Sequence, residues 1–303
     1  MQFDQRQADA ATSEINTLLC PMLDLAIADK RKAEYDATRG SGEGDVAKNR
    51  IGAGYIGVPC VRDLGFRYHR FPKEARDTGA NPGELQRHAA AGHWTENATL
   101  DWLGLVGMNI ITVALNDHGN EITDQWGKPK QIGWKDGKDP ETGQYRLAGE
   151  VDGVIIGVDD PHLASLIKPP CIWESKKATD KKWKKFAKEK VRGADPVYFG
   201  QVQVNMGYLG VMQTLFSMLN LDTMKFYFEL IPFDQRHAQD LVDRGVGVFQ
   251  TSSPYDLPRL GRSEDDLVCK FCDYRTQCWH GETNTVHVTS QLFNPNTMED
   301  PPF

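Results

Sequence analysis

The chain has 303 residues, of which 40% are hydrophobic and 25% charged, and its formal net charge is −7. The length and composition are ordinary for a globular protein that can bury one large α/β core or two small ones. The negative net charge argues against a protein that coats nucleic acid non-specifically. There is no apolar run of about 18 residues and no signal-peptide pattern, so we expect no membrane segment and a cytoplasmic location.

The first 50 residues are expected to form a helical arm and a linker. Apolar residues within 13–32 recur at the spacing of an amphipathic helix, and a glycine-rich stretch follows at 40–45. We expect the core to occupy residues 51–280. Residues 281–303 are polar and contain prolines, which predicts a loose tail.

Two helices are expected early in the core. Residues 55–68 should contain a turn and a short helix with Cys60 at its start, and residues 88–107 a longer helix. His93 and Glu96 lie on one face of the longer helix because they are three residues apart. A strand over 110–115 and a loop rich in glycine and charged residues should follow. The apolar stripe of the longer helix is expected to comprise Trp94, Ala98, Trp102 and Leu105.

Two predicted strands, residues 149–156 and 172–176, interrupt an apolar pattern with acids that a buried strand would not tolerate without a reason. Glu174 and Lys176 share a strand face, and Asp152 on the neighbouring strand can meet them there. Two carboxylates can hold Mg²⁺ or Mn²⁺, and the ammonium can orient a water or stabilise phosphate charge. Glu150 is expected on the same strand face as Asp152. The alternative is a hairpin with surface acids and an ion pair.

Basic residues crowd residues 176–192, with Trp183 and Phe186 between them. Such a run is either a solvated face or a surface for a nucleic-acid backbone with bases stacked nearby. A long buried helix is expected over 196–219, a strand over 225–232 and a helix over 234–250. This order predicts an α/β fold with a mixed central sheet flanked by helices.

Cys269, Cys272 and Cys278 have the spacing C-x2-C-x5-C, which indicates a metal ion or a metal cluster that needs one more ligand. Six cysteines in a chain of this length are too few for a disulfide scaffold. The candidates for the remaining ligand are Cys60, Cys20 and Cys171, with His280 for zinc.

Together these segments resemble the PD-(D/E)XK nuclease superfamily, specifically the RecB-like exonucleases with a cysteine-ligated iron-sulfur cluster, which include CRISPR-associated nucleases and phage relatives. The resemblance covers residues 55–279. The segment with His93 and Glu96 is similar to the first motif, whose Glu or His faces the metal. Asp152 is similar to the second-motif Asp. Residues 174–176 match the Glu-x-Lys motif, in which the carbonyl of Ser175 would complete the metal shell.

Gln201 resembles the fourth motif of this family, which usually reads Gln-x-x-x-Tyr. Asn205 stands at the tyrosine position here, and Tyr208 follows one turn later. Cys60 resembles the upstream cluster ligand better than Cys20 does, because Cys20 lies on the expected helix before the glycine-rich linker.

The resemblance implies a restriction-endonuclease-like core whose N- and C-terminal segments are joined by an iron-sulfur clasp. It implies an Mg²⁺- or Mn²⁺-dependent DNA exonuclease acting on single strands or duplex ends, with a recombination or repair protein as a further partner. The catalytic residues would be Asp152, Glu174, Lys176 and Gln201, and a [4Fe-4S] cluster would bind Cys60, Cys269, Cys272 and Cys278, with zinc as the alternative. The expected DNA contacts are Lys177, Lys181, Lys182, Lys184, Lys185 and Tyr198.

Two other functions remain open. A catalytically silent nucleic-acid-binding module would keep the fold but has no reason to retain buried acids. A restriction-type endonuclease would need an element that reads bases in the major groove, and the sequence contains no recognisable one.

Overall fold

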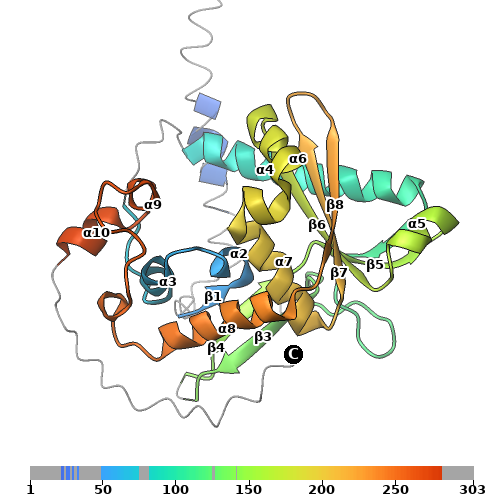
Figure 1. Ribbon diagram of the computed structural model, residues 1–303. Coiled ribbons are helices and arrows are strands. Elements are labelled where there is room, and N and C mark those ends of the chain that lie inside the picture. Colours follow the sequence, from blue (N-terminus) through green and yellow to red (C-terminus); the bar gives the residue numbers. More distant parts are fainter. Residues whose placement is uncertain are drawn as a thin grey trace, which may run out of the picture. The chain divides into compact units, whose positions relative to one another are not determined.

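The computed structural model describes residues 49–74, 82–124, 127–140 and 142–281, together with scattered helical positions between residues 22 and 33 (Figure 1). Most of the expected arm, nearly all of the expected tail and Cys20 lie outside the described residues. The chain divides into one unit of Met1–Ala47 with Asp77–Trp94 and a second unit of Lys48–Arg76 with Thr95–Phe303. Helix α4 (Pro82–Leu105) begins in the first unit and ends in the second.

The second unit contains two sheets. The larger is five-stranded, with strand order β2-β5-β6-β7-β8, and the smaller is three-stranded, with order β1-β4-β3. Strands β6 and β7 pair in parallel, and the other pairs of the larger sheet are antiparallel. The strands are β1 (Ile51–Gly52), β2 (Met108–Ile111), β3 (Gly133–Lys138), β4 (Tyr145–Glu150), β5 (Gly153–Val158), β6 (Cys171–Ala178), β7 (Gln213–Asn220) and β8 (Phe226–Pro232).

Helices cover both faces of the larger sheet, because successive side chains of β6 point to opposite sides. Ile172 packs with Phe186 and Val202 from the helices of one face, and Trp173 packs with Leu103 of α4 on the other. The expected mixed sheet flanked by helices is therefore confirmed. The remaining helices are α2 (Ala53–Ile56), α3 (Val61–Tyr68), α5 (Pro161–Leu166), α6 (Asp180–Ala194), α7 (Pro196–Leu209), α8 (Gln235–Phe249), the 3-10 turn η1 (Pro254–Asp256), α9 (Leu267–Lys270) and α10 (Arg275–His280).

Several predicted elements are confirmed. Helix α3 begins directly after its N-cap residue Cys60, and β6, β8 and α8 lie where the sequence placed them. Helix α5 was not predicted, although Asp160 caps it by accepting a hydrogen bond from the Leu163 amide at 2.8 Å. Within the described part of the chain, no helix combines the length and apolar character needed to cross a bilayer.

The predicted strand 149–156 is wrong, because it is two strands in two sheets. Strand β4 ends at Glu150 in the smaller sheet, and β5 begins at Gly153 in the larger one. The close packing behind Gly149 shows how tightly β4 is held: a Cβ there would lie 2.4 Å from Asn205 Oδ1. Asp152 therefore lies in the junction between the sheets, and Glu150 does not share a strand face with it.

The predicted helix 196–219 ends ten residues early, at Leu209. Gly210 follows in the left-handed conformation, with φ 65°, which ends the helix because few residues other than glycine adopt that conformation readily. Residues 213–220 then form β7, which is buried over almost its whole length. A strand buried on both faces lacks the alternating pattern that would have identified it.

The predicted apolar stripe of α4 is also wrong. Trp94, Trp102 and Leu105 are 52%, 39% and 83% exposed, whereas Thr95 and Thr99 are buried. The Thr99 hydroxyl donates a hydrogen bond to the Thr95 carbonyl at 2.7 Å, which removes much of the cost of burying it.

Candidate active site

Glu174 is the centre of the candidate site, and its side chain is only 1% exposed. It projects from β6, the middle strand of the larger sheet. Its Oε1 accepts hydrogen bonds from Gln201 Nε2 of α7 at 2.8 Å and from Lys176 Nζ. Its Oε2 is buried and has no hydrogen-bond partner among the described residues. A buried carboxylate oxygen without a partner is costly, so it needs either a proton or a cation.

The pKa of Glu174 is raised to about 7, chiefly by burial and also by the charges of Asp152 and Glu96, while Lys176 opposes the rise. Burial lowers the pKa of Lys176, but the charges of Glu174 and Asp152 outweigh that effect, and the pKa is raised. Lys176 is therefore a fixed positive charge at neutral pH. Perturbed ionisable groups that gather in this way are typical of catalytic sites.

Asp152 reaches Glu174 from the junction between β4 and β5. Its Oδ2 accepts a hydrogen bond from the Ser175 backbone amide at 2.7 Å. The pairing of Gly153 with Trp173 fixes the register of β5 against β6 and so places Asp152 beside residues 174–176. The two predicted acids therefore meet, although not through the simple strand pair that the sequence suggested.

Glu96 lies on the part of α4 that belongs to the second unit, and its charge acts on Glu174. His93 belongs to the first unit, so its role at the metal stays a prediction. The role of the Ser175 carbonyl also stays a prediction. Within the described ranges, no group of three or more His, Cys, Asp or Glu residues is arranged to hold a metal ion. The residues fit a metal in one respect, which is the partnerless Oε2 beside a second carboxylate.

A buried network behind the site was not predicted. Asn205 of α7 is fully buried; its Oδ1 accepts a hydrogen bond from Trp134 Nε1 at 2.8 Å, and its Nδ2 donates to the Glu150 carbonyl at 3.1 Å. Tyr208 stacks on Trp134 at 3.7 Å between ring centroids and donates to Asp136 Oδ2 at 2.7 Å. The network fixes the end of β4, two residues before Asp152. The only sequence signal was Asn205 at a position where the resembled family has tyrosine.

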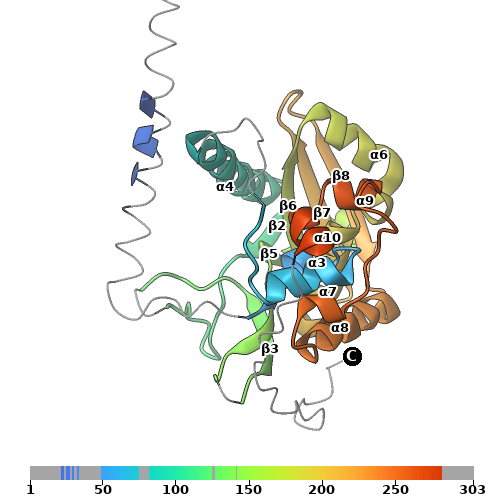
Figure 2. The ribbon, with the colours of Figure 1, turned by 90° about the vertical axis from the view of Figure 1, so that its left-hand side faces the viewer.

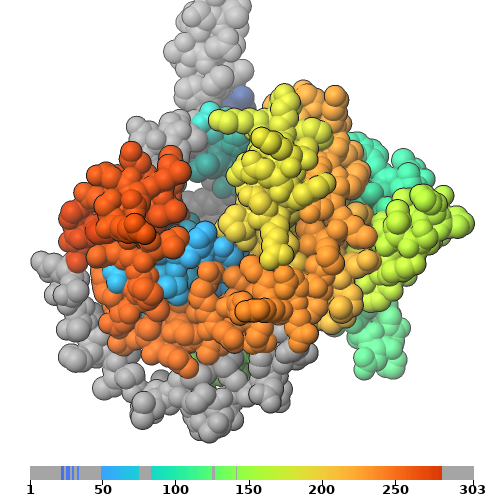
Figure 3. Space-filling model, viewed as in Figure 1, coloured from blue at the N-terminus to red at the C-terminus, as the bar shows by residue number. Residues whose placement is uncertain are grey.

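The predicted DNA-binding lysines lie around α6, at the surface of the second unit (Figure 3). Tyr198 connects them to the site: Lys176 Nζ lies 5.2 Å from its ring centroid and Lys182 Nζ 4.4 Å. A groove of about 590 Å³ follows this surface. Part of the charge is compensated, because Lys184 pairs with Asp180 at 2.6 Å and Lys182 with Asp195 at 3.6 Å. The lysines that line the groove are Lys181, Lys182, Lys184, Lys185 and Lys188.

The four predicted cluster cysteines line one small cavity of about 30 Å³. Cys60 reaches it from the start of α3, and the other three come from the segment 269–278. The pKa of the Cys272 thiol is raised to about 12, chiefly by burial and also by the charges of Asp63, Cys60 and Cys278, while a hydrogen bond from the Tyr274 backbone opposes the rise. Cys171 is buried in β6 and does not line this cavity.

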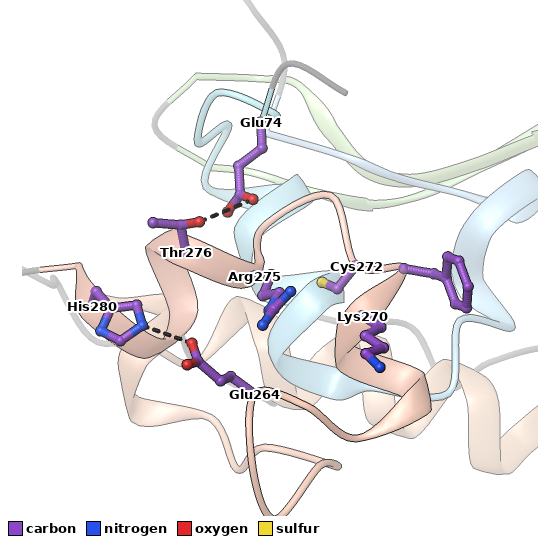
Figure 4. A pocket seen from close by; sticks show the side chains of 8 residues that line it. Glu74, Glu264, Lys270, Cys272, Arg275, Thr276 and His280 are labelled. Atoms are coloured by element: carbon purple, nitrogen blue, oxygen red, sulfur yellow. Dashed lines mark hydrogen bonds and ion pairs between the residues drawn. The ribbon is translucent and has the colours of Figure 1, made fainter. Parts of the chain in front are cut away.

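Polar contacts connect the two segments around the cysteine cavity. Arg62 donates to the Leu257 carbonyl at 2.6 Å and to the Tyr255 carbonyl at 2.8 Å. Glu74 accepts hydrogen bonds from the Thr276 hydroxyl and from the Gln277 amide, both at 3.2 Å. Figure 4 shows Glu74 with Thr276 beside a neighbouring pocket of about 330 Å³, and His280 paired with Glu264 at 2.7 Å. His280 is not among the residues lining the cysteine cavity.

No family model matches the chain, and no curated protein sequence matches it either. An alkaline exonuclease, LHK-Exo from Laribacter hongkongensis, is similar at 15% identity and a TM-score of 0.38, over 72% of this chain and 90% of that one. A structure of LHK-Exo in complex with dAMP has 14% identity and a TM-score of 0.38, over 66% of this chain and 86% of that one. The structure of SSO0001 has 14% identity and a TM-score of 0.41, over 88% of this chain and all (100%) of that one. Likeness at this level establishes neither a shared family nor a shared activity.

Proposed function

We propose that this chain is a divalent-metal-dependent nuclease that hydrolyses DNA phosphodiester bonds as an exonuclease, on single strands or duplex ends. The observation that carries the proposal is the buried Glu174 carboxylate, with one oxygen held by Lys176 and Gln201 and the other without a partner among the described residues. A purely structural ion pair would satisfy both oxygens. The motif residues of the PD-(D/E)XK pattern support the same reading.

The residues proposed to hold Mg²⁺ or Mn²⁺ are Glu174, Asp152, Glu96 and the Ser175 carbonyl, with His93 as a further candidate. Oxygen ligands favour these hard cations over zinc. Such a cation, when bound, polarises the phosphate and lowers the pKa of water.

The remaining roles, orienting the water and holding the carboxylates in place, would fall to side chains and backbone groups of the protein. The Lys176 ammonium, held by Glu174, would orient the attacking water and stabilise charge that develops on the phosphate. Gln201 would fix the rotamer of Glu174 through its 2.8 Å hydrogen bond. The Ser175 amide does the same for Asp152. Because Glu174 lies on a central strand, little reorganisation is needed at the moment of reaction.

We assign binding of the DNA backbone to the α6 groove, through Lys177, Lys181, Lys182, Lys184, Lys185 and Tyr198. Support comes from the contacts of the Tyr198 ring with Lys176 of the site and with Lys182, which lines the groove. A positively charged groove with an aromatic ring suits a strand whose phosphates and bases both need partners.

We also propose that Cys60, Cys269, Cys272 and Cys278 bind a [4Fe-4S] cluster, with a four-thiolate zinc site as the alternative. The support is that all four cysteines are among the residues lining one cavity. Thiolates are the ligating form, so a buried thiol with a raised pKa loses its proton only when a metal compensates the charge. The cluster would hold α3 against the segment 269–278.

End-labelled linear and unlabelled circular single-stranded DNA, each with Mg²⁺ or Mn²⁺, test the activity. We expect the linear strand to be degraded, the circle to stay intact, and no reaction to occur in EDTA. Loss of the circle would make the protein an endonuclease. Binding without loss of either would make it a silent nucleic-acid-binding module and overturn the proposal.

A further inference from the structure

A second groove, of about 870 Å³, lies between the smaller sheet and the ribbon that joins β2 to β3. The ribbon is a meander held by the bridges Val113–Gln131, Leu115–Glu121 and Thr123–Pro129. One wall of the groove carries Gly149 and Glu150, the last residues of β4. The groove therefore reaches Glu150, which stands two residues before Asp152 in the chain.

The groove carries three basic side chains, Arg50, Lys130 and Lys135. Among the described residues, none of the three forms an ion pair, in contrast to Lys182 and Lys184 on α6. Lys130 and Lys135 are exposed. Two acids also line the groove. Asp124 lies in the turn that the Thr123–Pro129 bridge closes, and Glu150 stands two residues before Asp152. Positive charge without a partner along a groove is the feature by which a polyanion is bound.

Several glycines line the groove, so a ligand can approach the backbone closely there. A Cβ at Gly54 would meet nothing within 4 Å, whereas one at Gly133 would lie 2.4 Å from the Gly149 carbonyl. The groove thus has open space at Gly54 and a tightly packed wall at Gly133. Its volume lies in the range of about 300–1,000 Å³ that holds one small ligand, which suits a short stretch of a single strand.

The two grooves lie on different sides of the acid site. In Figures 1 and 2 helix α6 stands above β6 and the smaller sheet lies below it. The Tyr198 ring lies near Lys176 of the site and near Lys182 of the α6 groove, and Glu150 of the second groove stands two residues before Asp152.

We propose that the second groove binds one single nucleic-acid strand on the side of the scissile phosphate opposite the α6 lysines, through Arg50, Lys130 and Lys135. The inference rests on the proposed nuclease function. It adds a substrate preference for a single strand, the occupant that the volume of the groove suits.

The test is binding of a fluorescein-labelled oligothymidylate of about 20 nucleotides in EDTA, where no cleavage occurs, measured by fluorescence anisotropy over a salt series. Lys130→Gln/Lys135→Gln is compared with Lys128→Gln/Lys138→Gln, which removes the same charge from the same ribbon and strand outside the groove lining. The groove variant should bind about tenfold more weakly, and its slope of log affinity against log salt should flatten by about 1.4, or 0.7 for each lost contact.

A second pair of variants fills the groove without removing charge. Gly54→Leu places a side chain where the structure has open space, and Gly247→Leu does the same on α8. Both should fold, since leucine favours helices more than glycine does. Only Gly54→Leu should weaken binding of the strand, by about tenfold for a blocked subsite.

Equal binding by the groove variants and their controls, with a wild type that still binds and cleaves, would overturn the groove and leave the proposed function standing. A wild type that neither binds nor cleaves DNA would overturn both. An equal loss in the Lys128→Gln/Lys138→Gln control would show a general charge effect and would also overturn the groove.

Discussion

The acid site and the cysteine cavity are built in opposite ways. The acids are held by neighbouring elements of the central sheet: Asp152 by the Ser175 amide, and Glu174 by Gln201 and Lys176. The cavity lies between α3 and a segment about 200 residues later in the chain, and all four cysteines are among the residues that line it. Where the fold positions the side chains of a site, replacing one of them should lower activity much more than the stability of the protein. A site that its ligands hold should lose stability first.

The largest effect is expected at the cysteine cavity. Cys60→Ser and Cys272→Ser should each lose the bound metal and several kcal/mol of stability, since the binding free energy of a structural metal becomes folding free energy, about 10–16 kcal/mol for small zinc domains. Anaerobically purified wild type should be brown, with a broad absorption near about 400 nm. Iron, sulfide and zinc analysis with thermal unfolding measures both effects.

Cys171→Ala and Cys20→Ser are the controls for the cavity. Cys171 is buried in the core of β6, so its variant should lose some packing and keep the metal. Metal lost from Cys20→Ser but kept in Cys60→Ser would move the fourth ligand to Cys20. A colourless wild type with one zinc would replace the iron-sulfur cluster by the zinc alternative.

At the acid site the order of effects reverses. Asp152→Ala and Lys176→Ala should each lower cleavage by at least about a hundredfold while the melting temperature stays close to that of wild type. Glu264→Ala, which removes an acid far from β6 in the sequence, should leave cleavage unchanged. Activity within tenfold of wild type in both site variants would remove the assignment.

The Asn205 network lies between these extremes, because it belongs to the fold and also fixes the strand that leads to Asp152. Asn205→Ala leaves Trp134 Nε1 and the Glu150 carbonyl without their partner. An unpaired buried group costs about 1–3 kcal/mol, so we expect a loss of about 3 kcal/mol in the free energy of unfolding and about tenfold in cleavage. Urea unfolding and a time course measure the two. The exposed Asn109→Ala is the control, and equal effects in both variants would exclude the positioning role.

The smallest effect is expected on α6. Lys181→Gln/Lys185→Gln/Lys188→Gln should weaken single-strand binding equally for all sequences and flatten the salt slope by about 2, at 0.7 per phosphate contact. Binding titrations at several salt concentrations with two unrelated oligonucleotides measure this. An unchanged slope would mean that these lysines form only a solvated face.

The positions of the candidate site residues could be predicted in part, because short-range rules place them in the fold. The strand period of two puts Glu174 and Lys176 on one face of β6. The turn before α3 places Cys60 at the start of that helix, where it is the N-cap residue. These features depend on residues within a few positions of one another. The four-cysteine grouping also followed from spacing and resemblance, and one cavity collects those residues.

What could not be predicted depends on distant packing. Residues 149–156 read as one strand, and only the contact of Asn205 with Gly149 and Glu150 shows where the chain passes from one sheet to the other. Strand β7 is buried on both faces, so its sequence reads equally well as a continuation of the buried helix α7. On α4, Thr95 and Thr99 are buried where an apolar stripe was expected, and the Thr99 hydroxyl reduces the cost of its burial by donating to the Thr95 carbonyl.

The central claim is that the partnerless Glu174 oxygen binds a divalent cation. Titration of metal-free protein with Mn²⁺ by calorimetry, for wild type and for the isosteric Glu174→Gln, tests it without depending on any nucleic acid. We expect saturable binding to wild type and binding at least about a hundredfold weaker to Glu174→Gln, which keeps the size of the side chain but removes its negative charge. Equal Mn²⁺ binding by the two proteins would show that the Glu174 carboxylate does not hold the cation.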